Sequence, residues 1–315
     1  MIGLGPFRVW TRQGNLDDLA AGRPRAVDPD EGLPSPNSLR RASDEAKLAV
    51  RAAWEVLGAS GVPVSDRVGL YVAEQQAPLD YCARFIEASV KEGPRLASPM
   101  LFAESVANNA ATHLSLTLGL TGGVQTFIGT RPAGIQALQA ASDDLSDGTV
   151  ETGLVVVLGT STDLLWDAYG SVFRPMRRRP RPKGLDYLRG AAAFLVRRDR
   201  GAARLLHAAV RCEGRTAVPR ALAALWRSLP GDPGRVLVSG FQLCEARDRR
   251  VVAGTLGGRD VSWGDPGPEA FALDPVLRLL VDARRSPGPR CRTLVCLSEE
   301  GTAGVCQIDG ELQGM

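Results

Sequence analysis

The sequence predicts an α/β fold of layered sheets and helices, built from two related halves. Nearly continuous apolar, β-prone runs at 68–73 and 154–158 are typical of strands covered on both faces. Helical spacing of apolar residues before and between these runs gives a strand–helix–strand order, which favours parallel pairing. The same alternation returns between 191 and 308. We therefore expect an N-terminal half at 1–165 and a C-terminal half at 166–315.

Composition narrows the functional classes. A chain of 315 residues with 44% hydrophobic residues can bury one large core or two medium ones. No apolar run approaches the ~18–20 residues of a membrane span, and the first ten residues lack the features of a signal peptide, so we expect a cytoplasmic protein without a membrane partner. A net charge of +3 gives no reason to expect nucleic acid.

The cysteines predict neither a metal site nor a cofactor. None of the six forms a C-x-x-C pair, which argues against zinc, and buried apolar thiols are the simplest interpretation. Only two histidines, His113 and His207, are available for general-base chemistry.

The N-terminal region begins with a short strand at 1–10, followed by a Pro-, Asp- and Gly-rich loop at 11–37. A helix is expected at 43–57. Ser43 is its N-cap, acidic residues fill its first turn, and Gly58 stands just past its end. The strand at 68–73 follows, and then a helix at about 105–118.

The segment from 124 to 158 contains a tight strand–turn–helix with an arginine at the turn. A strand at 124–128 leads through a sharp turn, Gly129-Thr130-Arg131, into a helix at 131–145, with Pro132 tolerated in its first turn. A buried strand follows at 154–158. A strand that feeds a helix through a tight turn is how many enzymes expose a nucleophile. Arg131, which occupies the turn, is not a nucleophile.

The second half opens with a basic, Pro-rich loop at 173–184, which is either an ordinary solvated loop or a docking site for an acidic partner. Strands are expected at 191–196, 205–210 and 236–238, and helices at 217–229 and 275–283. A hairpin of 293–297 with 305–308 closes the chain.

Several of these segments together resemble a beta-ketoacyl synthase of the thiolase-like superfamily. The resemblance covers, in order, the run 98–102 (SPMLF), Asn108, the Gly119-Leu120-Thr121-Gly122 turn, the strand 125–128 and Gly134. The flanking segments 38–73, 171–196 and 293–308 are also similar to family segments. This resemblance implies an αβαβα layered fold, with a C-terminal half shorter than is usual in the family.

The residues that the family uses for condensation are missing. Arg131 stands where the resemblance places a Cys nucleophile, and neither 238–250 nor the region near 263–271 contains a His. Arg189 replaces a family Glu, and the loop 298–301 lacks its Phe. Because a guanidinium stays protonated in proteins, Arg131 would either fill the acyl pocket and pair with an acid or bind an anion at the helix N-terminus. Cys244 is either a substitute nucleophile or an inert buried thiol.

A synthase fold without catalytic residues resembles a chain-length factor, the inactive partner of an active ketosynthase in type II polyketide, polyene or fatty-acid-like biosynthesis. The resemblance implies a heterodimer joined by the strand before the turn, an acyl tunnel lined from a loop at 100–102, and docking of an acidic acyl carrier protein. The interface residues would be Gln125, Thr126, Phe127, Ile128 and Gly129; the tunnel residues Met100, Leu101 and Phe102; and the docking residues Arg174, Arg177, Arg178, Arg179 and Arg181.

Two other functions remain open from the sequence. One is a diverged thiolase-fold acyltransferase or hydrolase that uses residues outside the family pattern, although no G-x-S-x-G motif is present. The other is a stand-alone scaffold or homodimer that binds carrier protein through the basic loop. The sequence leaves the pathway, the product length and the partner undetermined.

Overall fold

The computed structural model describes residues 2–76, 78–160, 162–172, 188–198, 201–214, 216–240, 245–257, 259, 261–263, 272–288, 290–298 and 300–314. Its strands are β1 (Ile2–Thr11), β2 (Gly14–Asn15), β3 (Val68–Glu74), β4 (Val124–Ile128), β5 (Thr152–Gly159), β6 (Gly190–Arg198), β7 (Ala203–Cys212), β8 (Arg235–Gly240), β9 (Val261–Ser262), β10 (Arg292–Leu297) and β11 (Thr302–Gly310). Its helices are α1 (Leu16–Ala20), α2 (Pro36–Leu39), α3 (Asp44–Ser60), α4 (Leu79–Glu92), α5 (Pro99–Ser105), α6 (Asn109–Leu118), α7 (Ala133–Asp147), α8 (Asp163–Val172), α9 (Val218–Arg227), α10 (Glu245–Leu256) and α11 (Leu273–Arg285).

The two halves have the same strand order. In the described part of the chain, the first-half sheet runs β1-β6-β5-β3-β4 and the second-half sheet runs β7-β11-β10-β8-β9. The three outer strands of each are parallel, and the remaining two pair antiparallel. A short antiparallel contact between Ile2–Leu4 and Ala203–Leu205 joins the two sheets. The predicted relation between the halves is confirmed. Strand β6, which follows the expected boundary at residue 165, pairs with β5 and β1.

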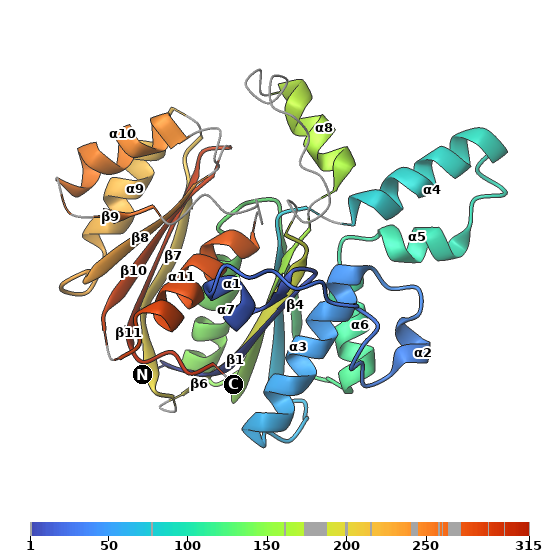
Figure 1. Cartoon of the computed structure of the whole chain (residues 1–315), viewed down its shortest axis with the longest axis horizontal. Coiled ribbons are helices and arrows are strands. Elements are labelled where there is room, and N and C mark those ends of the chain that lie inside the picture. The colour runs from blue at the N-terminus through green and yellow to red at the C-terminus, as the bar shows by residue number, and fades with distance from the viewer. Residues whose placement is uncertain are drawn as a thin grey trace.

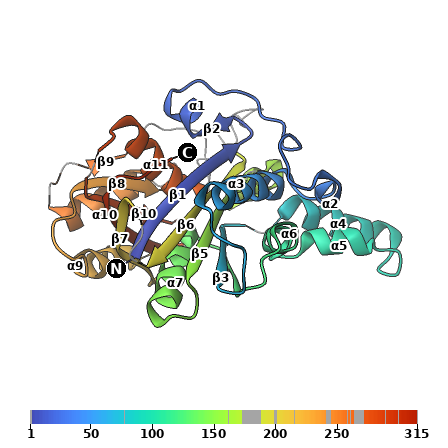
Figure 2. The ribbon, with the colours of Figure 1, turned by 90° about the horizontal axis from the view of Figure 1, so that it is seen from below.

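The layers follow from three apolar cores. The largest core contains residues of α7 and α11 together with inward-facing residues of both sheets, so these helices form the central layer. A second core lies between the first-half sheet and helices α3 and α6, and a third between the second-half sheet and helices α9 and α10. The result is the expected helix–sheet–helix–sheet–helix arrangement (Figures 1 and 2).

Local signals explain several element ends. Ser43 caps α3 as predicted, since its side chain accepts a hydrogen bond from the Ala46 amide. The expected end at Gly58 is wrong, because α3 continues to a left-handed cap at Gly61. Gly119 forms the same kind of cap on α6. Gly122 packs its backbone against the carbonyl of Val68, where a Cβ would collide, which gives a physical reason for this Gly-x-x-Gly turn.

The structure adds elements that the sequence analysis missed. The region 11–37, expected as loop, contains β2, the whole of helix α1 and the first half of helix α2. The segment 100–102 belongs to helix α5 and is not a loop, and α4 precedes it without having been predicted. Helices α4 and α5 with the residues that connect them (79–105), which we call the arm, bury no residue fully and extend away from the body of the molecule (Figure 1).

Within the described residues, no helix is both long and apolar enough to cross a membrane.

Candidate functional site

The turn between β4 and α7 has the geometry of a nucleophile elbow. After Ile128 the chain turns at Gly129, whose φ is +110° and whose amide donates to the Glu74 carbonyl at 3.3 Å. The Ala133 amide then bonds to the Thr130 carbonyl at 3.1 Å, which closes the turn at the start of α7. The predicted strand–turn–helix is confirmed. We call Gly129–Arg131 the elbow.

Arg131 points from the elbow into the protein, and 0% of its surface is exposed. Its Nη1 lies 3.7 Å from Oδ2 of Asp274, in the first turn of α11. The elbow of the first half therefore contacts an acid of the second half. Strand β11 fixes the elbow from the other side, since Gly304 leaves no room for a Cβ beside Pro132.

Asp274 is the centre of a buried polar cluster. Its Oδ2 accepts a hydrogen bond from Ser239 Oγ on β8 at 2.5 Å and one from Arg278 Nε on α11 at 2.8 Å. Because two guanidiniums approach this one carboxylate, its negative charge is well compensated despite burial. The cluster holds the end of β8, the start of α11 and the elbow together.

Arg131 cannot serve as a nucleophile at the elbow. A guanidinium stays protonated and has no lone pair available for attack on a thioester. The acidic partner that an arginine plug would require is present as Asp274. Anion binding by Arg131, the other interpretation from the sequence, would have to compete with this carboxylate.

In the second half, the region where the family resemblance places a histidine contains a glycine at the end of β8 and a buried acid instead. Strand β8 ends at Gly240, where any side chain would collide with the carboxylate of Asp248 on α10. Asp248 is buried, and its Oδ1 accepts from Arg247 Nε at 2.7 Å. Arg247 also donates to the Ser298 carbonyl at 3.1 Å, so this acid is paired within its own half. Cys244, which the sequence leaves open as either a substitute nucleophile or an inert thiol, lies outside the described residues.

The two histidines have structural surroundings. His113 Nε2 on α6 lies 3.1 Å from Glu104 Oε2 on α5, and Asn109 donates to the same oxygen at 2.9 Å. This group fastens the arm to α6. His207 on β7 contacts Ser228 Oγ at 3.0 Å, and burial lowers its pKa.

The predicted interface strand lies at the free end of the first-half sheet. In the described part of the chain, β4 pairs only with β3. Val124 and Ile128 are 45% and 39% exposed, whereas Phe127 packs against the central core. Gln125 donates to Asp144 Oδ2 on α7 at 2.9 Å. The strand is therefore held from one side and open on the other.

The predicted tunnel residues lie on the arm. Met100 and Phe102 are exposed and Leu101 is half-buried. The Phe102 ring lies 5.5 Å from that of Phe85 on α4, and Met100 accepts a contact from Arg41. The structure thus places this segment at an outer surface. The five docking arginines between 174 and 181 lie outside the described residues.

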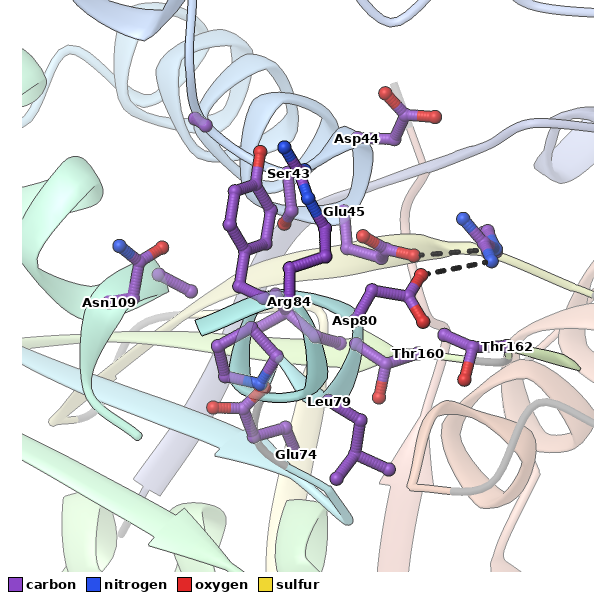
Figure 3. Close-up of a pocket in the computed structure, with 16 residues that line it drawn as sticks. Ser43, Asp44, Glu45, Glu74, Leu79, Asp80, Arg84, Asn109, Thr160 and Thr162 are labelled. Carbon is purple, nitrogen blue, oxygen red and sulfur yellow. Dashed lines mark ion pairs between the residues drawn. The ribbon is translucent and has the colours of Figure 1, made fainter. Parts of the chain in front are cut away.

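A pocket of about 200 Å³ lies near the carboxyl ends of β3 and β5, and the sequence analysis missed it (Figure 3). The first turns of α3 and α4 and the start of α6 form its walls. Arg189 bridges two acids from different helices: its Nε lies 3.7 Å from Glu45 Oε1, and its Nη2 lies 3.7 Å from Asp80 Oδ2. The arginine that replaces a family Glu therefore holds this pocket together. We call it the acidic pocket.

Two carboxyl groups of the acidic pocket have perturbed acidity. The pKa of Glu74 is raised to about 8, mainly by burial and to a smaller extent by the nearby charge of Glu45. Burial also raises the pKa of Glu45, against the opposing charge of Arg189. One signal in the sequence could have indicated this pocket: Glu74, a charged residue, directly follows the buried run 68–73.

The Asp274 cluster predicts an asymmetric response to mutation. Asp274→Asn should destabilise the fold by about 3 kcal/mol or more, because it leaves two guanidiniums facing a neutral amide. Arg131→Met should cost less, since Asp274 keeps Ser239 and Arg278. Adding Arg131→Met to Asp274→Asn should recover part of the loss. Thermal and urea unfolding measure these changes, with the exposed Asp66→Asn as control. Equal effects of Asp274→Asn and Asp66→Asn would rule out the cluster as a structural link.

Comparison with known proteins gives the fold a family. Residues 13–177, more than half of the chain, match the beta-ketoacyl synthase N-terminal domain family. No curated protein matches the chain. Among solved structures, the ishigamide ketosynthase/chain length factor has a TM-score of 0.78 at 16% identity, covering 98% of this chain and 99% of that one.

Two further structures agree with this result. A beta-ketoacyl synthase from Burkholderia phymatum STM815 has a TM-score of 0.74 at 14% identity, covering 99% of both chains. A type II polyketide synthase ketosynthase in complex with its acyl-carrier protein (AntDE:AntF) has a TM-score of 0.76 at 15% identity, covering 98% of this chain and 99% of that one. With its thiolase-like layered fold and its retained elbow, the chain belongs to the beta-ketoacyl synthase family.

Proposed function

We propose that this protein is a catalytically inactive ketosynthase-like subunit, similar to a chain-length factor. It pairs with an active ketosynthase in the cytoplasm and shapes the acyl tunnel of a type II polyketide, polyene or fatty-acid-like pathway. The observation that carries the proposal is Arg131, buried at the elbow and paired with Asp274 within an otherwise preserved ketosynthase fold.

The loss of activity is supported by what surrounds the elbow. A condensing enzyme needs a thiolate to carry the acyl chain and neighbouring groups to stabilise the developing charge. Arg131 cannot carry an acyl group, and the two histidines of the chain contact Glu104 and Ser228. Strand β8 ends in Gly240, where a side chain would meet Asp248.

The pairing role is supported by the hydrogen-bonding direction of β4. The Leu70 amide donates to the Gly123 carbonyl, and the Gly129 amide donates to the Glu74 carbonyl. Because alternate residues of a strand face the same neighbour in a ladder, the amides of Gln125 and Phe127 also face β3. The amides of Val124, Thr126 and Ile128 then face outward. An open edge of this kind accepts a strand from a second subunit.

The tunnel role is supported by the arm. Its apolar side chains are exposed in the isolated chain, including Ile86, Val90, Leu96, Met100 and Phe102. An apolar surface of this extent is typical of an interaction site. A partner seated on the arm would cover Phe102 and bring the half-buried Leu101 near its own acyl channel. Docking of an acyl carrier protein through the basic loop remains a prediction from charge.

The inactive state predicts a negative labelling result. The purified chain, incubated with an acyl-pantetheine thioester, should show no added mass in intact mass spectrometry. The active ketosynthase partner, treated in the same way, is the positive control. A stable acyl adduct on this chain would favour the alternative, a diverged acyltransferase with a nucleophile outside the elbow.

The edge strand predicts that one backbone amide matters for assembly. Thr126→Pro should abolish co-purification with a co-expressed ketosynthase partner, because proline removes an outward-facing donor while leaving the bonds to β3 intact. Thr126→Val keeps the amide and should preserve the complex. Size-exclusion chromatography with light scattering measures the mass of each assembly. If Thr126→Pro assembles as well as Thr126→Val, the β4 pairing is refuted.

The tunnel role predicts shorter products from a bulkier arm residue. In the reconstituted pair, Leu101→Trp should shift the products towards shorter chains, since a larger side chain reduces the volume open to the growing acyl group. Leu96→Trp places the same indole elsewhere on the arm and should leave product length unchanged. Mass spectrometry of released products gives the distribution. Identical distributions for the wild type and Leu101→Trp would contradict the tunnel role.

A further inference from the structure

The acidic pocket contains neither Arg131 nor any residue of β4. It is bounded by α3, α4 and the start of α6, with Thr160 and Thr162 after β5 adding hydroxyl groups to its wall. The volume of about 200 Å³ suits a small molecule of several non-hydrogen atoms. Its lining is polar and charged, which makes it a poor site for an unsubstituted acyl chain.

Glu74 is the group in this pocket that most needs a partner. Its surface is only 2% exposed, yet its side chain forms no hydrogen bond or ion pair within the described residues, and it lines the pocket. A buried carboxyl group normally has a donor, because its removal from water costs several kcal/mol otherwise. The main chain fixes its position, since the Glu74 carbonyl accepts the Gly129 amide.

The other charged groups that face the pocket already have partners. Arg189 is shared between Glu45 and Asp80, at 3.7 Å from each. Asp44 pairs with Arg12 outside the pocket at 3.4 Å.

At the mouth of the pocket, the exposed Arg84 lies over the ring of Tyr81 at 5.2 Å, and the Tyr81 hydroxyl donates to the Arg41 carbonyl. Within the pocket, the guanidinium of Arg189 lies between the carboxylates of Glu45 and Asp80. When Glu74 also ionises, these four groups carry a net negative charge.

We propose that the acidic pocket binds a small organic cation, a primary ammonium group on a short chain, with the carboxylate of Glu74 as its principal partner. An ammonium group has three donors, enough to reach Glu74, a neighbouring acid and a threonine hydroxyl together. In the described part of the chain, no group of three His, Cys, Asp or Glu side chains has the geometry to hold a metal ion, which favours an organic cation. The proposal does not depend on the subunit being inactive.

Binding should be coupled to the release of a proton. In the empty pocket Glu74, with its pKa raised to about 8, is mostly neutral at pH 7. An ammonium beside it favours the carboxylate and lowers its pKa, so complex formation near pH 7 expels about one proton. Affinity should therefore rise with pH until Glu74 is ionised in the free protein and then become constant. Other titratable groups also face the site, namely Glu45, Asp80, Tyr81, Arg84 and Arg189. Replacing Glu74 therefore isolates the contribution of Glu74 to the pH dependence of binding.

The experiment is isothermal titration of the full chain with n-butylammonium, n-butanol and butyrate, at pH 6.5, 7.5 and 8.5. The ammonium should bind, about tenfold more tightly at pH 7.5 than at pH 6.5, while the alcohol and the carboxylate should not. Titration in two buffers of different ionisation enthalpy should show the release of about one proton at pH 7. Putrescine tests whether a second amine adds affinity, and magnesium chloride tests for a metal ion as competitor.

The variant Glu74→Gln should bind n-butylammonium about tenfold less tightly at pH 8.5 and lose the pH dependence. It keeps the shape of the side chain and cannot ionise, so circular dichroism should show an unchanged fold. Glu311→Gln, an exposed acid elsewhere, is the matched control. Binding of butyrate equal to that of butylammonium, no binding of the ammonium, or an unaltered pH profile in Glu74→Gln would each overturn the proposal.

Discussion

The structure depends on one constraint: two related sheets share a single central layer of two helices. Helix α7 of the first half and α11 of the second lie in the same core, and Gly134 fits between Val157 and Val276 with almost no spare room. Because α7 begins at the elbow, whatever residue stands there is enclosed by both halves. A charged side chain at this point must find its counter-charge in the opposite half, and Arg131 finds Asp274.

This constraint explains why the elbow is retained in the fold even where it carries an arginine. The elbow is required to start α7 in the correct direction, irrespective of whether it carries a nucleophile. A buried arginine at this position needs a carboxylate nearby, and Ser239 and Arg278 hold Asp274 in place. On the other face of the first-half sheet lies α3, and near its first turn Arg189 contacts both Glu45 and Asp80 in the acidic pocket.

The sequence predicted the elements that periodicity and turn chemistry determine locally. Strand β4 was placed with its true ends, and Ser43 was recognised as an N-cap, because both signals lie within a few residues. Gly58 misled the prediction of the end of α3: a glycine in open space inside a helix looks like a cap unless the later Gly61 is known to be left-handed. The arm was missed because its apolar residues face outward and so give no core-facing pattern to recognise.

The site was predicted in part. Arg131 could be identified from the turn that contains it, but its pairing with Asp274 joins distant segments and depends on the central layer. The acidic pocket as a whole could not be predicted from the sequence. Its charged residues, Glu45, Glu74, Asp80 and Arg189, come from separate elements, and the local sequence around each of them shows no sign of a shared site. Acidic residues in the first turn of a helix are expected for reasons of dipole alone.

The position of β1 has a consequence for how the chain is made. This first strand pairs with β6 and with β7, so its partners are the residues 190–198 and 203–205. During synthesis, residues 2–11 stay without these partner strands until residues 190–205 have also been made. Neither sheet can close before then, because β1 stands at the junction of both. Folding should therefore be a late and slow event governed by non-local contacts, and the apolar strand β1 needs shielding until its partners are available.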